Sequence, residues 1–149
     1  MLFRSSEAHW LALLFSFGYN LAMTEKASGQ PKPLEWIGSS KKDLLALPGE
    51  VVDVFGYALH LAQTGKMHSH AKPLRGFGSA GVLEVVEDLR GNTYRAVYTV
   101  RYAMRVFVLH VFQKKSKSGI ATPKSDMDLI KNRLKVAAKR AKELENEQA

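Results

Sequence analysis

Cysteine is absent from the 149 residues of the chain. This absence excludes disulfide bonds, thiolate metal sites and a cysteine nucleophile, and it fits a reducing, cytoplasmic compartment. The sequence also lacks a G-x-S-x-G motif, so the elbow that presents a serine nucleophile in α/β hydrolases is not indicated. No internal repeat is present. The length and composition are those of one globular domain.

The balance of charge is one-sided in the second part of the chain, where basic residues outnumber acidic ones. The formal net charge is +8, and residues 1–65 sum to −1, residues 66–113 to +4 and residues 114–149 to +5. A one-sided basic excess favours a polyanionic partner such as nucleic acid, but a well-solvated basic surface explains the same numbers equally well. Charge alone leaves both interpretations open.

A long apolar run is also missing. The most apolar stretch, His9–Met23, is too short for a membrane span and is interrupted by polar residues and glycine, so no membrane association is expected. No A-x-A-like cleavage site follows it, as a signal peptide would require. We favour the hypothesis that Met23 is the biological start, with a short helix packed on the domain as the alternative. Residues 1–30 are assigned to an extension or linker and residues 31–149 to one domain.

Hydrophobic periodicity predicts an α+β fold with an N-terminal strand and helical hairpin, an antiparallel sheet of about four strands and a C-terminal amphipathic helix. The predicted elements, in chain order, are a strand at 33–38, helices at 40–47 and 50–64, strands at 82–89, 93–100 and 104–112, and a basic helix that starts at Thr122-Pro123. Ser40 with Asp43 three residues on predicts the N-cap of the first helix. Residues 66–80 lose the periodicity and are expected to form a loop.

Glycines in that loop match a dinucleotide fingerprint in spacing only. The stretch "RGFGSAG" contains G-x-G-x-x-G. A dinucleotide site needs a strand before these glycines and a helix after them, so that the helix N-terminus holds the pyrophosphate. Here a loop precedes the glycines and a strand follows. The glycines are therefore expected to turn the chain into the strand at 82–89.

Strand alternation places the charged and polar residues of the meander. In the second strand Tyr94, Ala96 and Tyr98 share one face, and Arg95 lies on the other with Val97. An arginine in the middle of a strand is costly unless it is paired or reaches water. In the third strand the expected faces are Val106, Val108, His110 and Phe112 against Phe107, Leu109 and Val111.

Cations and histidines supply the candidate site residues. A meander can bring several basic residues onto one concave face, namely Lys72, Arg75, Arg95, Lys114, Lys115 and Lys117. His68 and His70 offer two metal ligands, but no third is evident near them in sequence, so no metal site is predicted.

Three motifs then carry a resemblance: "KPLRG" before the meander, "YRAVY" in its second strand and "FQKKSKSGIATPK" after its third. In this order they resemble the RelE/HigB-like superfamily of toxins from type II toxin–antitoxin systems, and most of all its phage-derived branch, from about Pro33 to Lys142. The resemblance implies a RelE-like fold and a cytoplasmic endoribonuclease that cuts mRNA on the ribosome without metal or cofactor. It also implies neutralisation by a helix-turn-helix antitoxin.

The resemblance further implies roles for single residues. Arg95 matches a phosphate-stabilising arginine, and Lys115, with Lys114 beside it, matches the cation that follows the last strand. Lys72 falls at the active-site edge with Arg75 as its partner, and Lys117 extends the RNA-binding set. In such a reaction the 2′-hydroxyl attacks the adjacent phosphate, cations stabilise the phosphorane and an acid protonates the leaving 5′-oxygen.

The proton-transfer residues stay open. Glu84 is either a general base or the partner of Arg95, and pairing is the favoured interpretation. His70 and Tyr98 are candidates for the general acid, each weighed below a structural role. Because the lysines and the late tyrosine of some relatives are missing, the alternative function is a non-catalytic RNA- or protein-binding module on the same fold. Charge reversal at Arg95 is expected to abolish toxicity while leaving the protein folded.

Overall fold

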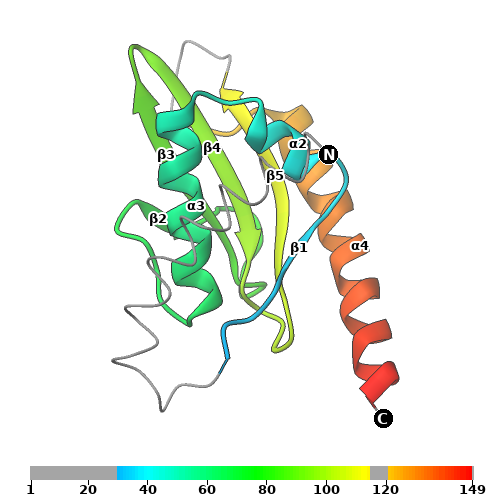
Figure 1. Cartoon of the computed structure of the whole chain (residues 1–149). Coiled ribbons are helices and arrows are strands. Elements are labelled where there is room, and N and C mark those ends of the chain that lie inside the picture. The colour runs from blue at the N-terminus through cyan, green and yellow to red at the C-terminus, as the bar shows by residue number, and fades with distance from the viewer. Residues whose placement is uncertain (1–29, 115–120, 149) are drawn as a thin grey trace.

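The computed structural model describes residues 30–114 and 121–148, so Lys115, Lys117 and the N-terminal extension lie outside the described residues. Its elements are β1 (Leu34–Trp36), α2 (Ser40–Leu45), α3 (Gly49–Gln63), β2 (Ala71–Pro73), β3 (Val82–Leu89), β4 (Asn92–Thr99), β5 (Val106–Lys114) and α4 (Lys124–Gln148) (Figure 1). The α+β fold, the helical hairpin and the C-terminal helix predicted from the sequence are confirmed.

The sheet differs from the prediction in size and direction. It has five strands in the order β1-β5-β4-β3-β2, where about four antiparallel strands were expected. β1 pairs in parallel with β5, and the other neighbours are antiparallel, so the sheet is mixed. The additional strand, β2, lies within the predicted loop at 66–80. It has three residues and ends in Pro73, which an edge strand tolerates because one of its sides makes no ladder hydrogen bonds.

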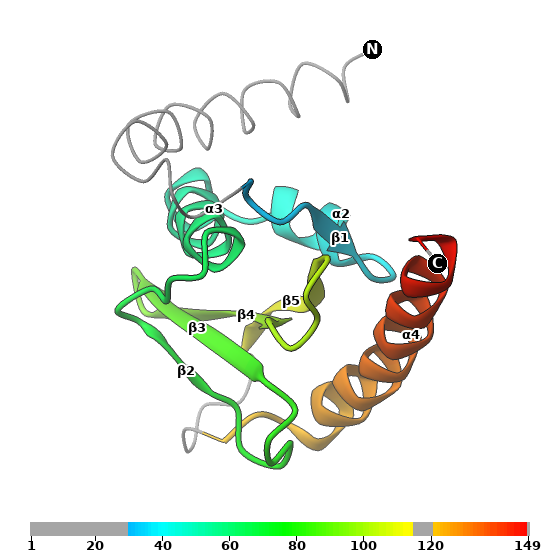
Figure 2. The ribbon, with the colours of Figure 1, turned by 90° about the horizontal axis from the view of Figure 1, so that it is seen from below.

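Helices cover both faces of the sheet. Figure 2 shows α2 and α3 on one side and α4 on the other. Tyr94, Ala96 and Tyr98 of β4 belong to the core under α2 and α3, whereas Val97 belongs to the core under α4. The alternation predicted for this strand is therefore confirmed. We call the second side the α4 face.

A β-bulge interrupts the pairing of β5 with β4. Val97 lies opposite His110, but the next residue, Tyr98, lies opposite Val108, so Leu109 is an extra residue in β5. Before the bulge β5 alternates as expected. Beyond it the faces exchange, because an inserted residue shifts the period of two by one. The predicted placement of His110 and Phe112 with Val108 is wrong for this reason, and both lie on the α4 face.

The ends of the helices also depart in detail from the sequence signals. Ser39, not Ser40, is the N-cap of α2, and the hydroxyl of Ser40 donates to the Val108 carbonyl instead. α4 starts at Lys124, one residue beyond the expected start. The helix is amphipathic as predicted, and its apolar side buries Ile130, Ala137, Ala141 and Leu144. Among the described helices, none combines the length and the apolar character needed to cross a bilayer.

Candidate functional site

A row of three charged side chains crosses β2, β3 and β4 on the α4 face. Lys72 lies opposite Glu84, and Glu84 is diagonal to Arg95. Glu84 Oε1 is 3.7 Å from Lys72 Nζ, and Glu84 Oε2 accepts a hydrogen bond from Arg95 Nη1 at 3.1 Å. The expected pairing of Glu84 with Arg95 is present. Two of the cations that were predicted to share a face are thus joined through one carboxylate, which we call the charged row.

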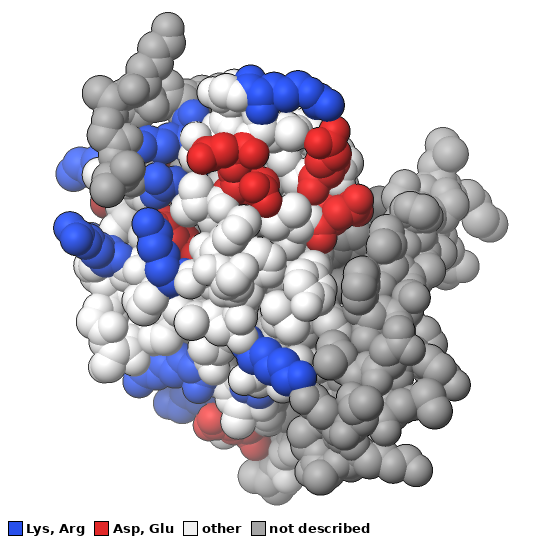
Figure 3. Space-filling model, turned by 90° about the vertical axis from the view of Figure 1, so that its left-hand side faces the viewer, with Lys and Arg blue, Asp and Glu red and all other residues white. Residues whose placement is uncertain are grey.

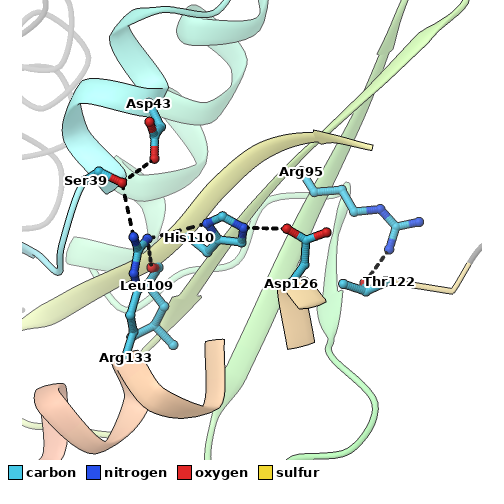
Figure 4. Close-up of polar contacts among 8 residues, drawn as sticks. All are labelled: Ser39, Asp43, Arg95, Leu109, His110, Thr122, Asp126 and Arg133. Atoms are coloured by element: carbon cyan, nitrogen blue, oxygen red, sulfur yellow. Dashed lines mark hydrogen bonds and ion pairs between the residues drawn. The ribbon is translucent and has the colours of Figure 1, made fainter. Parts of the chain in front are cut away.

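Burial divides the charged row into an open end and a closed end. The side chain of Lys72 is 57% exposed, whereas those of Glu84 and Arg95 are 5% and 4% exposed. Arg95 Nη1 also donates to Thr122 Oγ1 at 2.8 Å, just ahead of α4 (Figure 4). Arg95 therefore joins the sheet to the start of α4, and Lys72 is the cation that faces solvent.

A second polar network links β5, α4 and α2 (Figure 4). His110 Nε2 is 2.8 Å from Asp126 Oδ1, and His110 Nδ1 is 3.4 Å from Arg133 Nη1. Arg133 Nη2 donates to Ser39 Oγ at 3.1 Å, and Ser39 Oγ donates to Asp43 Oδ2 at 2.7 Å. Arginine only donates, so the Arg133 guanidinium faces His110 Nδ1 while the Asp126 carboxylate faces His110 Nε2. Both ring nitrogens are engaged in these contacts, so the imidazole positions Asp126.

An open cleft of about 700 Å³ adjoins this network. The end of α2, the second half of β5 and the first turn of α4 form its walls. Asp43, Asp126 and Gln113 contribute polar groups, and the apolar lining consists of Ala46, Leu47, Val111, Phe112 and Pro123. Phe112 stacks on His110 with ring centroids 4.5 Å apart. Phe112 also lies opposite Arg95 in the sheet register, so the cleft and the closed end of the charged row are neighbours.

Neither candidate for the general acid lies at the charged row. Tyr98 packs in the core under α2 and α3, on the other side of the sheet. It is fully buried, and this burial raises the pKa of Tyr98 to about 12. His70 precedes β2, and its Nδ1 is 3.9 Å from Glu87 Oε2. Glu87 lies three residues beyond Glu84 in β3, so its side chain is on the other face of the sheet. His70 contacts Glu87 and is therefore also directed away from the charged row.

The remaining predicted cations that the structure describes, Arg75 and Lys114, lie in separate parts of the fold. Arg75 is exposed in the loop between β2 and β3, and Lys114 ends β5. On the face drawn in Figure 3, lysine and arginine side chains gather at the margins of a mostly uncharged centre. The structure does not join Arg75 to the charged row.

The histidine pair before β2 is not arranged as a metal site. The rings of His68 and His70 meet edge to face at 5.0 Å, and His68 contacts Tyr57 in the same way at 5.7 Å. Burial, followed by the proximity of His70, lowers the pKa of His68, and Glu87 partly opposes this. Within residues 30–114 and 121–148, no three histidine, aspartate or glutamate side chains come together as metal ligands.

Sequence reasoning missed His110, Asp126 and Arg133. Regular alternation along β5 assigns His110 to the wrong face. The bulge that exchanges the two faces contains no glycine or proline, so the sequence gives no signal of it. By helical spacing Arg133 falls on the polar side of α4, so its position does not mark it as a site residue. The one usable signal is Asp126 in the first helical turn, where an acidic residue is also expected for the helix dipole alone.

Comparison with known proteins adds the family. Neither a curated protein sequence nor a solved structure matches the chain. The model of a protein family described as "Phage derived protein Gp49-like (DUF891)" matches residues 42–135. This match begins in α2, includes the charged row and the cleft, and ends in α4 just beyond Arg133. Because it extends over well more than half of the sequence, the chain belongs to the phage-derived Gp49-like family.

Proposed function

We propose that this protein is the toxin of a type II toxin–antitoxin system and acts as a metal-independent endoribonuclease on mRNA at the ribosome. The observation that carries the proposal is the charged row, in which an exposed lysine is held by a buried carboxylate and a buried arginine. Membership in the phage-derived family and the sequence resemblance to RelE/HigB-like toxins support it. A cognate helix-turn-helix antitoxin is part of the same proposal.

In this proposal the three residues of the charged row have different tasks. Lys72 contacts the scissile phosphate, because its ammonium group is exposed and can stabilise charge that develops on a phosphorane. Glu84 positions Lys72 through their ion pair, and Arg95 positions Glu84 through its hydrogen bond. Arg95 is a positioning residue here, since a guanidinium that is 4% exposed beside Glu84 does not face an incoming phosphate.

The test replaces Lys72 in the full chain. Induced expression in a bacterial host, followed by 5′-end mapping of mRNA, should show growth arrest and new ends within codons. Lys72→Ala should lower the frequency of new ends by about 10²-fold, the effect of removing one preorganised charge-stabilising group. Because Lys72 is mostly exposed and Glu84 keeps its hydrogen bond from Arg95, this variant should stay folded. Lys72→Arg should recover part of the activity.

A matched control separates a specific role from loss of basic charge. Lys131→Ala removes an equally charged, exposed lysine from α4 and should leave the new ends unchanged. If both lysine variants behave alike, Lys72 has no role at the phosphate.

The burial of Arg95 favours the non-catalytic RNA- or protein-binding module as the second candidate. That module predicts RNA binding that weakens steeply with salt, without growth arrest and without new mRNA ends. Abundant soluble protein that binds RNA but leaves every transcript intact would replace the ribonuclease proposal with this one.

A further inference from the structure

We propose that the cleft between α2, β5 and the start of α4 binds a nucleobase of RNA and prefers guanine. The inference rests on the proposed function for the identity of the polymer. Its chemistry comes from the cleft itself, which combines apolar walls with two carboxylates directed by a shared polar network.

The size and lining of the cleft suit a flat heterocycle. Its volume of about 700 Å³ lies within the range of small-molecule sites. Leu47 and Pro123 lie on separate elements that border it, and Phe112 adds an aromatic side chain. Apolar and aromatic surfaces of this kind bind bases through their π-faces, whatever the sequence.

The polar groups of the cleft select for hydrogen-bond donors. Asp43 uses Oδ2 to accept from Ser39, and Asp126 uses Oδ1 to accept from His110. In the described part of the chain the second oxygen of each carboxylate has no hydrogen-bond partner. An ionised carboxylate only accepts, so the ligand must present N–H groups. Guanine can donate to one carboxylate through N1–H and one hydrogen of its N2 amino group, and to the other carboxylate through the second hydrogen of that amino group. Uracil offers one N–H between two carbonyl oxygens, which carboxylates repel.

The two carboxylates are held before any ligand arrives. Arg133 contacts both His110, which positions Asp126, and Ser39, which positions Asp43 (Figure 4). The imidazole of His110 is 8% exposed. One guanidinium thus ties together the two walls that carry the acceptors, which reduces the ordering cost of binding.

The surroundings favour an RNA base over the cationic side chain of a partner protein. The chain carries a net charge of +8, which attracts a polyanion, whereas the carboxylates exclude phosphate from the cleft itself. A polynucleotide satisfies both conditions, because its backbone is anionic and its guanine edge presents donors. An arginine or lysine side chain satisfies only the second.

The experiment uses backbone amide NMR of the full chain titrated with guanosine 5′-monophosphate. We expect shifts at Val111, Gln113 and Ser125, around the cleft. Inosine 5′-monophosphate lacks only the N2 amino group and should bind at least about fivefold more weakly, the lower end for one bidentate base contact. Inorganic phosphate should leave these three amides unmoved.

Three variants test the acceptors. Asp43→Asn and Asp126→Asn each replace a carboxylate oxygen by a donor and should weaken guanosine 5′-monophosphate by a similar factor. Among the described residues the carboxylate of Asp43 hydrogen-bonds only to Ser39, so its variant stays informative even if the Asp126 variant fails to fold. Asp128→Asn is the matched control, because Asp128 lies on the same helix outside the cleft, beside Lys124, and should bind like the wild type.

Several results would overturn the inference. These are equal affinities for the guanosine and inosine nucleotides, shifts that inorganic phosphate reproduces, and binding that Asp43→Asn leaves intact. Uptake of arginine amide in the cleft without uptake of the guanosine nucleotide would assign the site to a protein partner instead. Because the titration requires no cleavage, guanosine binding by a chain that leaves mRNA intact would reject the proposed function and retain this inference.

Discussion

The ion pair of Glu84 and Arg95 allows a sharp prediction about stability. Both side chains are about 95% buried, and they meet at 3.1 Å. Removing one partner of such a pair costs about 3–5 kcal/mol, because a charge is left in a medium that solvates it poorly. Replacing both by apolar residues of similar volume is often neutral or stabilising. We therefore expect Glu84→Leu and Arg95→Met to destabilise strongly as single changes and weakly as a pair.

Urea unfolding of the four proteins measures this coupling. In thermal unfolding of a domain of this size, each kcal/mol of lost stability lowers Tm by about 2–4 °C. Each single variant should therefore melt about 6–20 °C below the wild type. The double variant should fall short of the sum of the two single losses by several kcal/mol. Single variants within 1 kcal/mol of the wild type, or strictly additive losses, would refute the argument from burial.

The same burial corrects an expectation from the sequence. Charge reversal at Arg95 was expected to leave the protein folded, as it would on an exposed strand. In the structure Arg95→Glu places a second carboxylate beside Glu84, next to Thr122 and out of contact with water. Loss of toxicity in that variant would report unfolding, so the exposed Lys72 is the position at which activity and stability can be separated.

Two further predictions concern other parts of the domain. Gly38 has a φ of +59°, and an added Cβ would lie 2.9 Å from the guanidinium of Arg133. Gly38→Ala should therefore lower the free energy of unfolding in urea by at least about 1–2 kcal/mol, and it should shift the ring resonances of His110. Burial lowers the pKa of His60 below 6.5, so the unfolded chain binds more protons just below that pH and stability falls as the pH decreases through it. Urea midpoints between pH 7.5 and 4.5 should show this fall, and His60→Leu should reduce it; a fall that is unchanged in the variant would remove His60 as its source.

Elements with a strong local signal were predictable from the sequence. α3 and α4 repeat apolar residues at helical spacing, and β3 and β4 are joined by Arg90-Gly91, where both residues have positive φ as a tight hairpin turn requires. β2 was missed because three residues are too few to establish a period. The parallel pairing of β1 with β5 was missed because it joins segments some 70 residues apart, and no local pattern records it.

The site was predictable only in strands whose side chains alternate regularly between the two faces of the sheet. Arg95 and Glu84 lie in regular stretches of β4 and β3, so their shared face and their pairing follow from a period of two. His110 lies beyond a bulge that depends on tertiary packing, and its partners come from α4 and from the N-cap of α2. Tyr98 shows the converse: its chemistry suits an acid, but its position in the same alternation places it on the other face from Arg95.

The accessible chemistry around the charged row lies in two places. Arg95, between them, is covered by Thr122, so a ligand meets Lys72 at the β2 edge and the carboxylates of Asp43 and Asp126 in the cleft beside β5. The first place attracts anions, and the second accepts hydrogen bonds from donors and repels anions. A nucleotide has this same polarity, with charge on its phosphate and donors on its base. A single anion or a single cation would satisfy one of these places and be repelled at the other, which is the reason we propose a polymer of nucleotides as the ligand.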